Sequence, residues 1–369
     1  MPKTVALVTG FPSTMARTIV RSLLTGDDQT EVVLLVRGKI RDTAIAWHAI
    51  LPDPQRDRVT LLDGDVVHLD FGLSGDEYRG LSRKVTHVYH AAQVTYHGAP
   101  RDQALLVNIG GAREVVEFAQ ACERLKSATA ISSALVSGDR TGVVLEDDLK
   151  KGQTFRNAVE ESLARAELLY RKAMEKSPFV VLRPSVIVGD SQTGEVDRLD
   201  GPYLLVLLVL ASPPDFAMPL LGRGETPLHV VPVDYVARAA IELSNKPSAI
   251  GKTCHLVDPA PVPVRRFFEF VTRAGGRRNP RGSIPANLAK ALLRAPGLDR
   301  FVKSPRAFLD AMVTPVWYDA RNTEQCLLTT QCPPLQEYVE RLVAYTQARV
   351  QEQRNIKREE GEIEDPLLG

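Results

Sequence analysis

The sequence has few cysteines, and their arrangement does not suit a metal site. Four are scattered along 369 residues, namely Cys122, Cys254, Cys326 and Cys332. Cys326 and Cys332 lack the spacing of a zinc knuckle, and no second pair accompanies them. We therefore expect reduced thiols, no metal ion and a cytoplasmic protein.

Long apolar runs and an excess of charge of one sign are also missing. The most apolar stretch, Leu204–Ala211, is far shorter than the ~20 residues that span a bilayer. It predicts no transmembrane segment, and instead either a buried helix or a wall for a long apolar substrate. The N-terminus runs directly into a strand pattern, so no signal peptide is expected. A formal net charge of +1 gives no support for a nucleic-acid or membrane-surface role driven by bulk electrostatics.

The most informative stretch lies at the start of the chain. An apolar run, Thr4–Thr9, ends at Gly10 and passes through a short turn into a helical pattern. This order of strand, tight turn and helix N-terminus presents backbone N–H groups to a pyrophosphate in nucleotide-binding domains. The usual spacing of three glycines reads here Gly10, Ser13 and Ala16. Ser13 places a Cβ where the backbone would approach the phosphates, so the turn alone leaves nucleotide binding and a purely structural role both open.

Strand and helix patterns alternate through the first half of the chain. After the first strand, we predict strands at 31–38, 59–62, 85–90, 128–133 and 179–183, with long helices at 101–124 and 155–176. A strand at 253–257 is expected to return to the same sheet. The pattern predicts an α/β fold, a doubly wound parallel sheet (Rossmann fold) with a smaller, mainly helical C-terminal lobe.

The second half is mainly helical and rich in Pro and Gly turns. Helices are expected at 233–243, 264–274, 284–293, 305–313 and 335–350. We predict a dinucleotide-binding domain at 1–258, with lobe insertions at about 190–232, and a helical substrate lobe at 259–350. The charge-dense residues 351–369 are expected to be disordered.

Arg37 stands at the end of the second strand. An acidic residue here would bind a ribose 2′-hydroxyl, whereas an arginine suits a 2′-phosphate. Arg37 therefore favours NADP(H) over NAD if a dinucleotide binds. The alternative is an arginine that extends along a strand end to reach water.

Several short patterns agree in both order and spacing. They are Thr9-Gly10-Phe11-Pro12, Gly64-Asp65-Val66, His90-Ala91-Ala92, Asn108-x-x-Gly111, Ser132-Ser133-Ala134-x-Val136-x-Gly138 and Leu182-Arg183-Pro184-Ser185-x-Ile187-x-Gly189. Together they cover about residues 4–190. The chain resembles the extended short-chain dehydrogenase/reductase (SDR) family, near the branch of thioester reductases and fatty acyl-CoA reductases.

The resemblance implies a role for each matching residue. The pyrophosphate would be wrapped by Gly10, Phe11, Pro12, Ser13, Thr14 and Met15. Arg37 would face the adenosine phosphate, and Asp65 with Val66 would hold the adenine. Ala91 and Ala92 would pass under the cofactor, and Pro184 and Ser185 would lie along the nicotinamide. Asn108 would bridge backbone groups near the active site, where Ser133 matches the Ser or Thr that hydrogen-bonds the substrate oxygen.

The family's catalytic Tyr and Lys are absent. They are spaced i, i+4 on one helix, where the Tyr exchanges a proton with the substrate and the Lys binds the nicotinamide ribose. Val159 and Leu163 stand at these positions, while Asn157 and Ser162 still match the register. No tyrosine elsewhere has a lysine four residues on. Apolar side chains cannot transfer a proton, so hydride transfer by the standard route is not expected.

Three functions remain open on the sequence. The first is a pseudoenzyme that binds NADP(H) for a regulatory or partner-binding role. The second is an active NADP-dependent reductase of an acyl thioester, aldehyde or ketone with another proton donor, for which His90, Tyr96 or the Tyr170–Lys172 region are conceivable. The third is a binding module that keeps only the fold. Relatives suggest a possible homodimer through helices 101–124 and 155–176, into whose packing Val159 and Leu163 could have been recruited.

Overall fold

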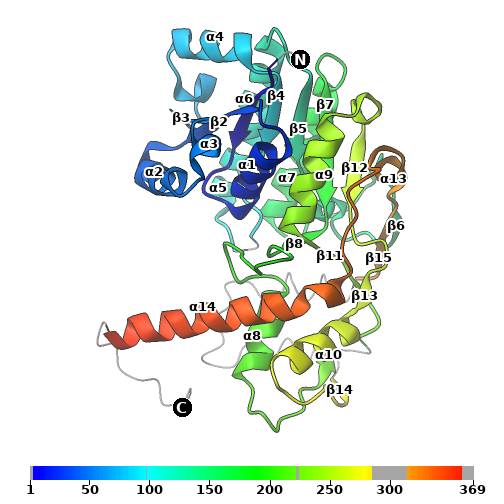
Figure 1. The fold of residues 1–369 in the computed structure, drawn as a ribbon. Coiled ribbons are helices and arrows are strands. Elements are labelled where there is room, and N and C mark those ends of the chain that lie inside the picture. Colours follow the sequence, from blue (N-terminus) through cyan, green and yellow to red (C-terminus); the bar gives the residue numbers. More distant parts are fainter. Residues whose placement is uncertain (1–2, 97, 222–223, 285–313, 360–369) are drawn as a thin grey trace. The chain divides into compact units, whose positions relative to one another are not determined.

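The computed structural model describes residues 3–96, 98–221, 224–284 and 314–359. The chain divides into two compact units (Figure 1). Unit 1 is formed by Met1–Val186, Val233–Val257 and Val316–Cys332. Unit 2 is formed by Ile187–Pro232, Asp258–Pro315 and Pro333–Gly369. Each unit is therefore built from separate stretches of the sequence.

Unit 1 contains a seven-stranded sheet in which every pairing is parallel. Its order is β12-β7-β5-β4-β1-β2-β3. The strands are β1 (Val5–Thr9), β2 (Glu31–Val36), β3 (Val59–Asp63), β4 (His87–His90), β5 (Ser127–Ile131), β7 (Phe179–Pro184) and β12 (Thr253–Leu256). β1 pairs with β2 on one side and with β4 on the other, so the strand order reverses there. Ligands of such sheets bind outside the carboxyl ends of the strands at this reversal. The predicted Rossmann fold is confirmed.

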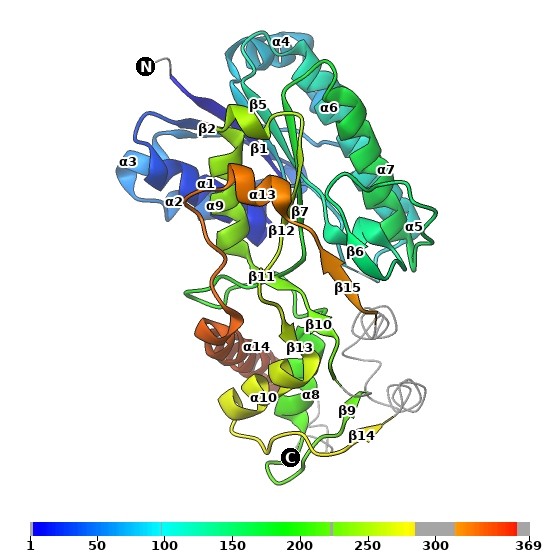
Figure 2. The same cartoon turned by 90° about the vertical axis from the view of Figure 1, so that its right-hand side faces the viewer.

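Helices cover both faces of this sheet (Figure 2). On one face, α1 (Thr14–Gly26) packs against α9 (Val233–Ser244). On the other face lie α4 (Gly75–Lys84), α6 (Gly111–Ala121) and α7 (Ala158–Ala173). Buried side chains of α6 and α7, such as Phe118 and Tyr170, join Val88 and Val181 of the strands in one apolar core. Short helices α2 (Arg41–Ala49) and α3 (Asp53–Arg56) follow β2.

Local capping explains where several helices begin. Ser74 and Glu77 form a reciprocal capping box at the start of α4. The Asn157 side chain accepts hydrogen bonds from the backbone N–H groups of Val159 and Glu160, both at 3.0 Å. This cap fixes the start of α7 at Ala158 rather than at the predicted residue 155.

The predicted helix at 101–124 is interrupted. It consists of α5 (Arg101–Ala104), a π-helical segment at Leu105–Gly110, and α6. Asn108 lies inside the π-helical segment, and its side chain bonds to groups outside the helix. Such segments occur frequently at functional sites.

Unit 2 contains helices around an apolar centre. α8 (Tyr203–Ala211) packs against α10 (Val264–Ala274) and α14 (Val339–Glu359). The short strands are β8 (Val186–Val188), β9 (Leu220–Leu221), β10 (Pro227–Leu228), β11 (Val230–Pro232), β13 (Val262–Pro263) and β14 (Ser283–Ile284). Five of the first seven α8 side chains are buried, in agreement with a buried helix. None of the helices in the described ranges is both long and apolar enough to cross a membrane.

One segment of the lobe expected at 259–350 belongs to unit 1 instead. Residues 316–332 return to unit 1, where β15 (Val316–Tyr318) pairs with β6 (Gly142–Val144) and α13 (Arg321–Cys326) contacts β12. A buried carboxylate, Glu146, accepts hydrogen bonds from Asn322 N, Thr323 N and Thr323 Oγ1. These contacts join residues some 176 positions apart, and no local pattern predicts them.

A second carboxylate holds the other end of this segment. Glu242 of α9 accepts hydrogen bonds from the backbone N–H groups of Leu328, Thr329 and Thr330. Burial alone would raise the pKa of Glu242, but these bonds and the Thr329 hydroxyl lower it to about 2 from an ordinary 4.5. The carboxylate form therefore stabilises the folded chain.

Acid is expected to remove this contribution. Because the pKa of Glu242 is lower in the folded chain, its stabilisation is present above about pH 4.5 and is lost as the pH falls toward 2. With solvent screening, we expect about 1–2 kcal/mol. Thermal unfolding at pH 6 and pH 3 should show a smaller acid-induced loss in Glu242→Gln than in the wild type. Equal losses in both proteins would contradict this account.

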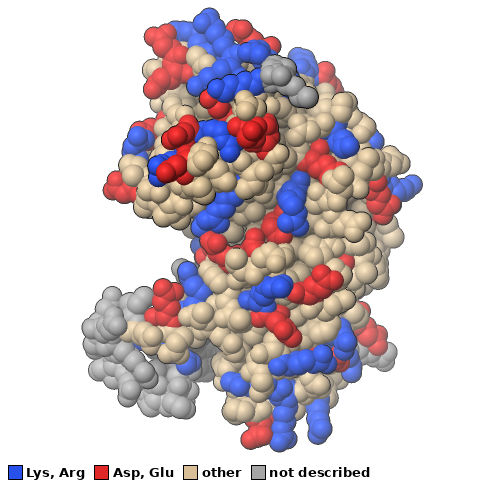
Figure 3. All heavy atoms as spheres, viewed as in Figure 1, with Lys and Arg blue, Asp and Glu red and all other residues tan. Residues whose placement is uncertain are grey.

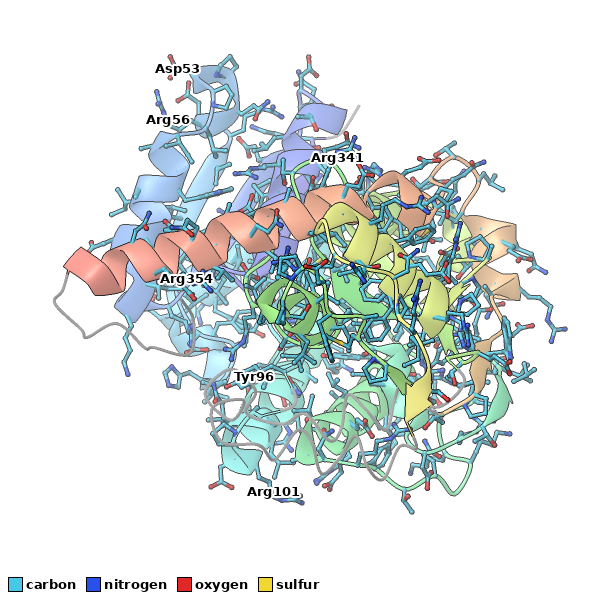
Figure 4. The ribbon with its side chains drawn as sticks, turned by 90° about the horizontal axis from the view of Figure 1, so that it is seen from below. Asp53, Arg56, Tyr96, Arg101, Arg341 and Arg354 are labelled. Atoms are coloured by element: carbon cyan, nitrogen blue, oxygen red, sulfur yellow. The ribbon has the colours of Figure 1, made fainter. Side chains whose placement is uncertain are left out.

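The end of the chain also differs from the expectation. α14 continues to Glu359, so the prediction of disorder from residue 351 is wrong for 351–359. Figure 4 marks Arg341 near its start and Arg354 near its end. Arg341 donates to the carbonyl oxygens of Ser191 and Glu337, which anchors the first turns within unit 2. Residues 360–369, and the predicted helices at 284–293 and 305–313 apart from Ile284, lie outside the described residues.

Candidate functional site

The turn after β1 makes a close approach that only glycine allows. Gly10 has a φ of +98°, and a Cβ placed on it would lie 2.6 Å from the backbone carbonyl of Ala91. The backbone after β1 thus lies directly against the backbone after β4. This contact lies at the carboxyl ends of β1 and β4, where the strand order reverses and where a dinucleotide would lie. Ala91 and Ala92 are placed there by the end of β4.

Ser13 caps the helix that follows this turn. Its Oγ accepts a hydrogen bond from Ala16 N at 3.2 Å, and its φ of −56° is ordinary for any residue. The turn therefore does not require glycine at this position. Phe11 points inward and packs on Trp47 of α2 with ring centroids 5.5 Å apart, while Thr14 and Met15 are buried. The peptide bond between Phe11 and Pro12 is cis.

A group of basic residues follows β2. Arg37 is exposed, and its side chain makes no hydrogen bond or ion pair with the rest of the described chain. Lys39 is exposed two residues later, and Arg41 pairs with Asp63 at the end of β3. Arg37 follows the carboxyl end of β2, and Arg41 is joined to the last residue of β3, so both lie at the sheet edge where an adenosine phosphate would be placed.

The segment after β3 folds back on itself. Asp65 Oδ1 accepts a hydrogen bond from Val67 N at 3.2 Å, and Asp65 N donates to the Phe71 carbonyl. Val66 is buried against Gly111 of α6. Asp70 and Phe71 both have positive φ, which is uncommon for residues with side chains. The fold-back holds Asp65 and Val66 at the carboxyl edge of the sheet.

Asn108 connects the loop after β4 with α7. Its Oδ1 accepts from Val94 N at 2.8 Å, and its Nδ2 donates to the Val94 carbonyl and to Ser162 Oγ. The π-helical segment presents this side chain to both partners. Asn108 therefore positions the N-terminal part of α7, where the family would carry its catalytic pair.

Val159 and Leu163 lie in an apolar cluster. Each side chain is only 1% exposed, and their buried neighbours are Val94, Ala104, Val136, Leu149 and Ala164. Partly buried Tyr96 and Phe155 pack around the same cluster. Apolar side chains thus occupy the two positions that the resemblance assigns to Tyr and Lys, and mainly apolar side chains surround them. Nothing at either position can donate a proton.

Ser133 begins the short turn after β5. Its Oγ accepts a hydrogen bond from Leu135 N at 3.2 Å, and its side chain is largely buried. Sequence reasoning missed a tyrosine that reaches this turn from β15. Tyr318 Oη donates to the Ala134 carbonyl at 3.4 Å and lies 3.3 Å from Ser137 Oγ. Burial raises the pKa of Tyr318.

The other conceivable proton donors are His90, Tyr170, Lys172 and Tyr96, and their contacts are those of residues that stabilise the fold. His90 is fully buried, its Nδ1 lies 2.8 Å from Thr9 Oγ1, and burial lowers its pKa to about 4. Tyr170 is stacked on Phe179 in the core, and burial raises its pKa far above its usual range. Lys172 is exposed, whereas Tyr170 is buried. Tyr96 donates to Gln103 at 3.1 Å.

A buried ionic network supports the turn that carries Ser133. Arg183 and Glu167 are both 0% exposed and are joined at 2.7 Å. Glu167 also accepts from Ser132 Oγ and pairs with Arg171, while Arg183 donates to the Asp148 carbonyl. The Leu182-Arg183-Pro184 pattern was visible in the sequence, but its partners on α7 were not. The network links β5, β7 and α7.

The residues present suit a nicotinamide dinucleotide. Gly10 lets the backbone after β1 lie against Ala91 at the carboxyl edge of the sheet, and Arg37 offers an uncommitted cation at the end of β2. Ser185, next to Pro184 at the end of β7, is 5% exposed, and its Oγ has no hydrogen-bond partner. A buried hydroxyl without a partner is costly, and a polar ligand group would satisfy it. By contrast, no group of three His, Cys, Asp or Glu in the described ranges could hold a metal ion.

The strand order and the turn after β1 are those of a dinucleotide-binding Rossmann domain. The model of the family described as male sterility protein matches residues 8–240, and the chain belongs to this family. The match runs from Val8 in β1 through most of α9, so it includes most of unit 1 together with Ile187–Pro232 of unit 2.

Curated relatives include several reductases. Glycine betaine reductase ATRR of Emericella nidulans is 26% identical over 68% of this chain and 19% of its own length. L-2-aminoadipate reductase of Schizosaccharomyces pombe is 22% identical over 73% of this chain and 20% of its own. Fatty acyl-CoA reductase wat of Drosophila melanogaster is 21% identical over 63% and 52%. The chain thus spans about a fifth of the first two relatives and about half of the third.

Solved structures share the fold at low sequence identity. The terminal R domain of the myxalamid PKS-NRPS pathway superposes with a TM-score of 0.78 at 21% identity, covering 95% of this chain and 92% of that domain. A thiolation-reductase di-domain from an archaeal non-ribosomal peptide synthetase gives 0.72 at 16% identity, covering 94% and 76%. UDP-glucuronic acid 4-epimerase of Bacillus cereus in complex with NAD gives 0.68 at 14% identity, covering 94% and 99%.

Proposed function

We propose that this chain binds NADP(H) on a reductase-type scaffold that has lost the standard route of hydride transfer, and that it serves a regulatory or partner-binding role. One observation carries the proposal. Val159 and Leu163 are enclosed in apolar packing at the positions where the resemblance requires a proton donor and its lysine. A positioned general acid contributes about 10²–10⁴ to the rate, so its loss alone removes most turnover.

Residues at the carboxyl edge of the sheet would bind the cofactor. The Gly10–Met15 turn and the α1 N-terminus would hold the pyrophosphate, and Asp65 with Val66 would hold the adenine. Arg37 would pair with a 2′-phosphate, which favours NADP(H) over NAD. When bound, the nicotinamide supplies a hydride. Ser185 and Pro184 would orient that ring, whereas no described side chain at positions 159 and 163 would move the accompanying proton.

Calorimetric titration with NADPH, NADP, NADH and NAD tests the binding half of this proposal. We expect micromolar binding of NADPH and a loss of about tenfold or more in Arg37→Ala, because a charge-assisted contact to phosphate is removed. Arg56→Ala is the matched control, since Arg56 pairs with Asp53 in α3 and should leave affinity unchanged (Figure 4). Absence of binding to all four nucleotides would favour a module that keeps only the fold.

The position of Tyr318 favours a second candidate function. Its hydroxyl donates to the Ala134 carbonyl, in the turn that begins at Ser133. A phenol there could supply the proton that Val159 cannot. The chain would then be an active NADP-dependent reductase of an acyl thioester, aldehyde or ketone. The named activities of several relatives support reductase chemistry of this kind.

Oxidation of NADPH in the presence of such compounds distinguishes the two candidates. Turnover that falls at least 100-fold in both Tyr318→Phe and Ser133→Ala would establish the second candidate. Tyr78→Phe is the control, because its ring packs on Phe71 and Phe118 of the core. No turnover in the wild type, with NADPH bound, would support the first candidate.

Self-association is a further part of the proposal. α5, α6 and α7 pack together within unit 1, and Leu106 beside them is 55% exposed. We propose a homodimer through these helices. We also propose a cytoplasmic location, where the four cysteines would stay reduced. Light scattering of the wild type and of Leu106→Glu would test the dimer. A monomeric wild type would contradict it.

A further inference from the structure

Positive charge is concentrated in one stretch of unit 2. Residues 264–284 contain six arginines and a single acid, Glu269, which gives a net charge of +5 in a chain whose total is +1. The near-neutral total therefore conceals a strongly basic region. Blue side chains gather at the end of unit 2 that carries α10 and β14 (Figures 1 and 3).

The fold turns several of these arginines outward. α10 buries Phe267 and Phe268, while Arg273 at its last turn is exposed. Arg278 and Arg281, in the loop that follows, are exposed as well. The next arginine after α10, Arg277, is the exception, because it donates to two backbone carbonyls at the end of α8 and thereby caps that helix.

An exposed phenylalanine lies in a turn that contacts Arg278 and Arg281. The turn after α8 is closed by a hydrogen bond from Phe216 N to the Pro213 carbonyl, and the Phe216 side chain is 50% exposed. Arg278 pairs with Asp215 at 2.9 Å, and Arg281 N donates to the Met218 carbonyl at 3.2 Å. The loop after α10 thus runs along the turn that carries Phe216. Pro213 and Pro214 of the turn are exposed as well.

We propose that the face formed by Phe216, Arg273, Arg278 and Arg281 docks onto an anionic phospholipid surface. Phe216 would enter the interface between headgroups and acyl chains, and the arginines would pair with lipid phosphates and carboxylates. A short turn with one exposed aromatic and two exposed prolines suits insertion into a lipid surface. A stacking platform for single-stranded nucleic acid uses several aromatics along a groove.

Co-sedimentation of the full chain with lipid vesicles tests the proposal. At 0.1 M salt, we expect binding to vesicles with 30% phosphatidylserine and little binding to pure phosphatidylcholine. Each arginine near such a surface contributes about fivefold to partitioning, so Arg273→Gln/Arg278→Gln/Arg281→Gln should weaken binding about 100-fold. Phe216→Ser should weaken it about tenfold.

A triple variant elsewhere on the surface separates local from overall charge. Arg79→Gln/Arg83→Gln/Arg113→Gln removes the same charge from exposed positions of unit 1 and should change partitioning much less. Thermal unfolding of every variant should match the wild type. Equal binding to both lipid mixtures, equal losses in the two triple variants, or no vesicle binding by a chain that binds RNA or an acidic peptide would overturn the proposal.

Discussion

Replacing Leu163 with lysine is expected to destabilise the protein by about 3–5 kcal/mol. Leu163 is 1% exposed, and its buried neighbours are apolar. A lysine there would place an ammonium group without a partner in a hydrocarbon cluster, which carries a penalty of this size. Chemical denaturation at 25 °C measures the loss as a lower midpoint with an unchanged slope.

A matched substitution separates charge from shape at the same position. Leu163→Met keeps the volume and adds no charge, so it should cost less than about 1.5 kcal/mol. The double variant Val159→Tyr/Leu163→Lys should also remain without turnover, because the space around the pair is filled. A cost below about 1 kcal/mol for Leu163→Lys would mean that water or cofactor reaches the position, contrary to our account.

Replacing Arg183 with methionine is expected to cost about 3–5 kcal/mol as well. Arg183 and Glu167 are both fully buried, and removal of the guanidinium leaves the Glu167 charge with only Arg171 as ionic partner. Leaving a buried carboxylate undercompensated is more costly than removing both charges. The double variant Arg183→Met/Glu167→Gln should therefore recover part of the loss. Thermal or chemical unfolding measures each step.

Arg165 provides the comparison on the same helix. It is 56% exposed and pairs with Glu161 at 3.4 Å, so Arg165→Met should change stability by less than about 1 kcal/mol. The contrast tests whether burial decides the energetic weight of an ion pair in α7. Similar losses for Arg183→Met and Arg165→Met would contradict that view.

Much of unit 1 could be predicted because its signals are local. Strands buried on both faces read as apolar runs, as in Val32–Val36, and turn residues such as Gly10 mark their ends. The alternation of strands and helices also predicted that a ligand would bind at the carboxyl edge of the sheet. The sequence also predicted that apolar residues stand on α7 where the resemblance places a Tyr and a Lys, and the structure buries both Val159 and Leu163.

Other features depend on contacts that no local pattern reveals. The return of residues 316–332 to unit 1 rests on Glu146 and Glu242, whose partners lie far away in sequence. The same segment brings Tyr318 to the Ser133 turn, 181 positions from Ser137 in the sequence, so the i, i+4 spacing of Tyr and Lys does not indicate it. The total charge does not reveal the basic region of α10, because acidic residues elsewhere in the chain balance its arginines.

The most direct test of this account is to measure hydride transfer by protein that is known to hold NADPH. The wild type would be saturated with NADPH, as established by calorimetry, and mixed with a panel of acyl thioesters, aldehydes and ketones. Absorbance of the reduced nicotinamide would then be followed over many hours. We predict saturable binding and no oxidation above the protein-free rate, because Val159 and Leu163 replace the proton donor and its lysine. Substrate-dependent oxidation that disappears in Ser133→Ala would contradict it.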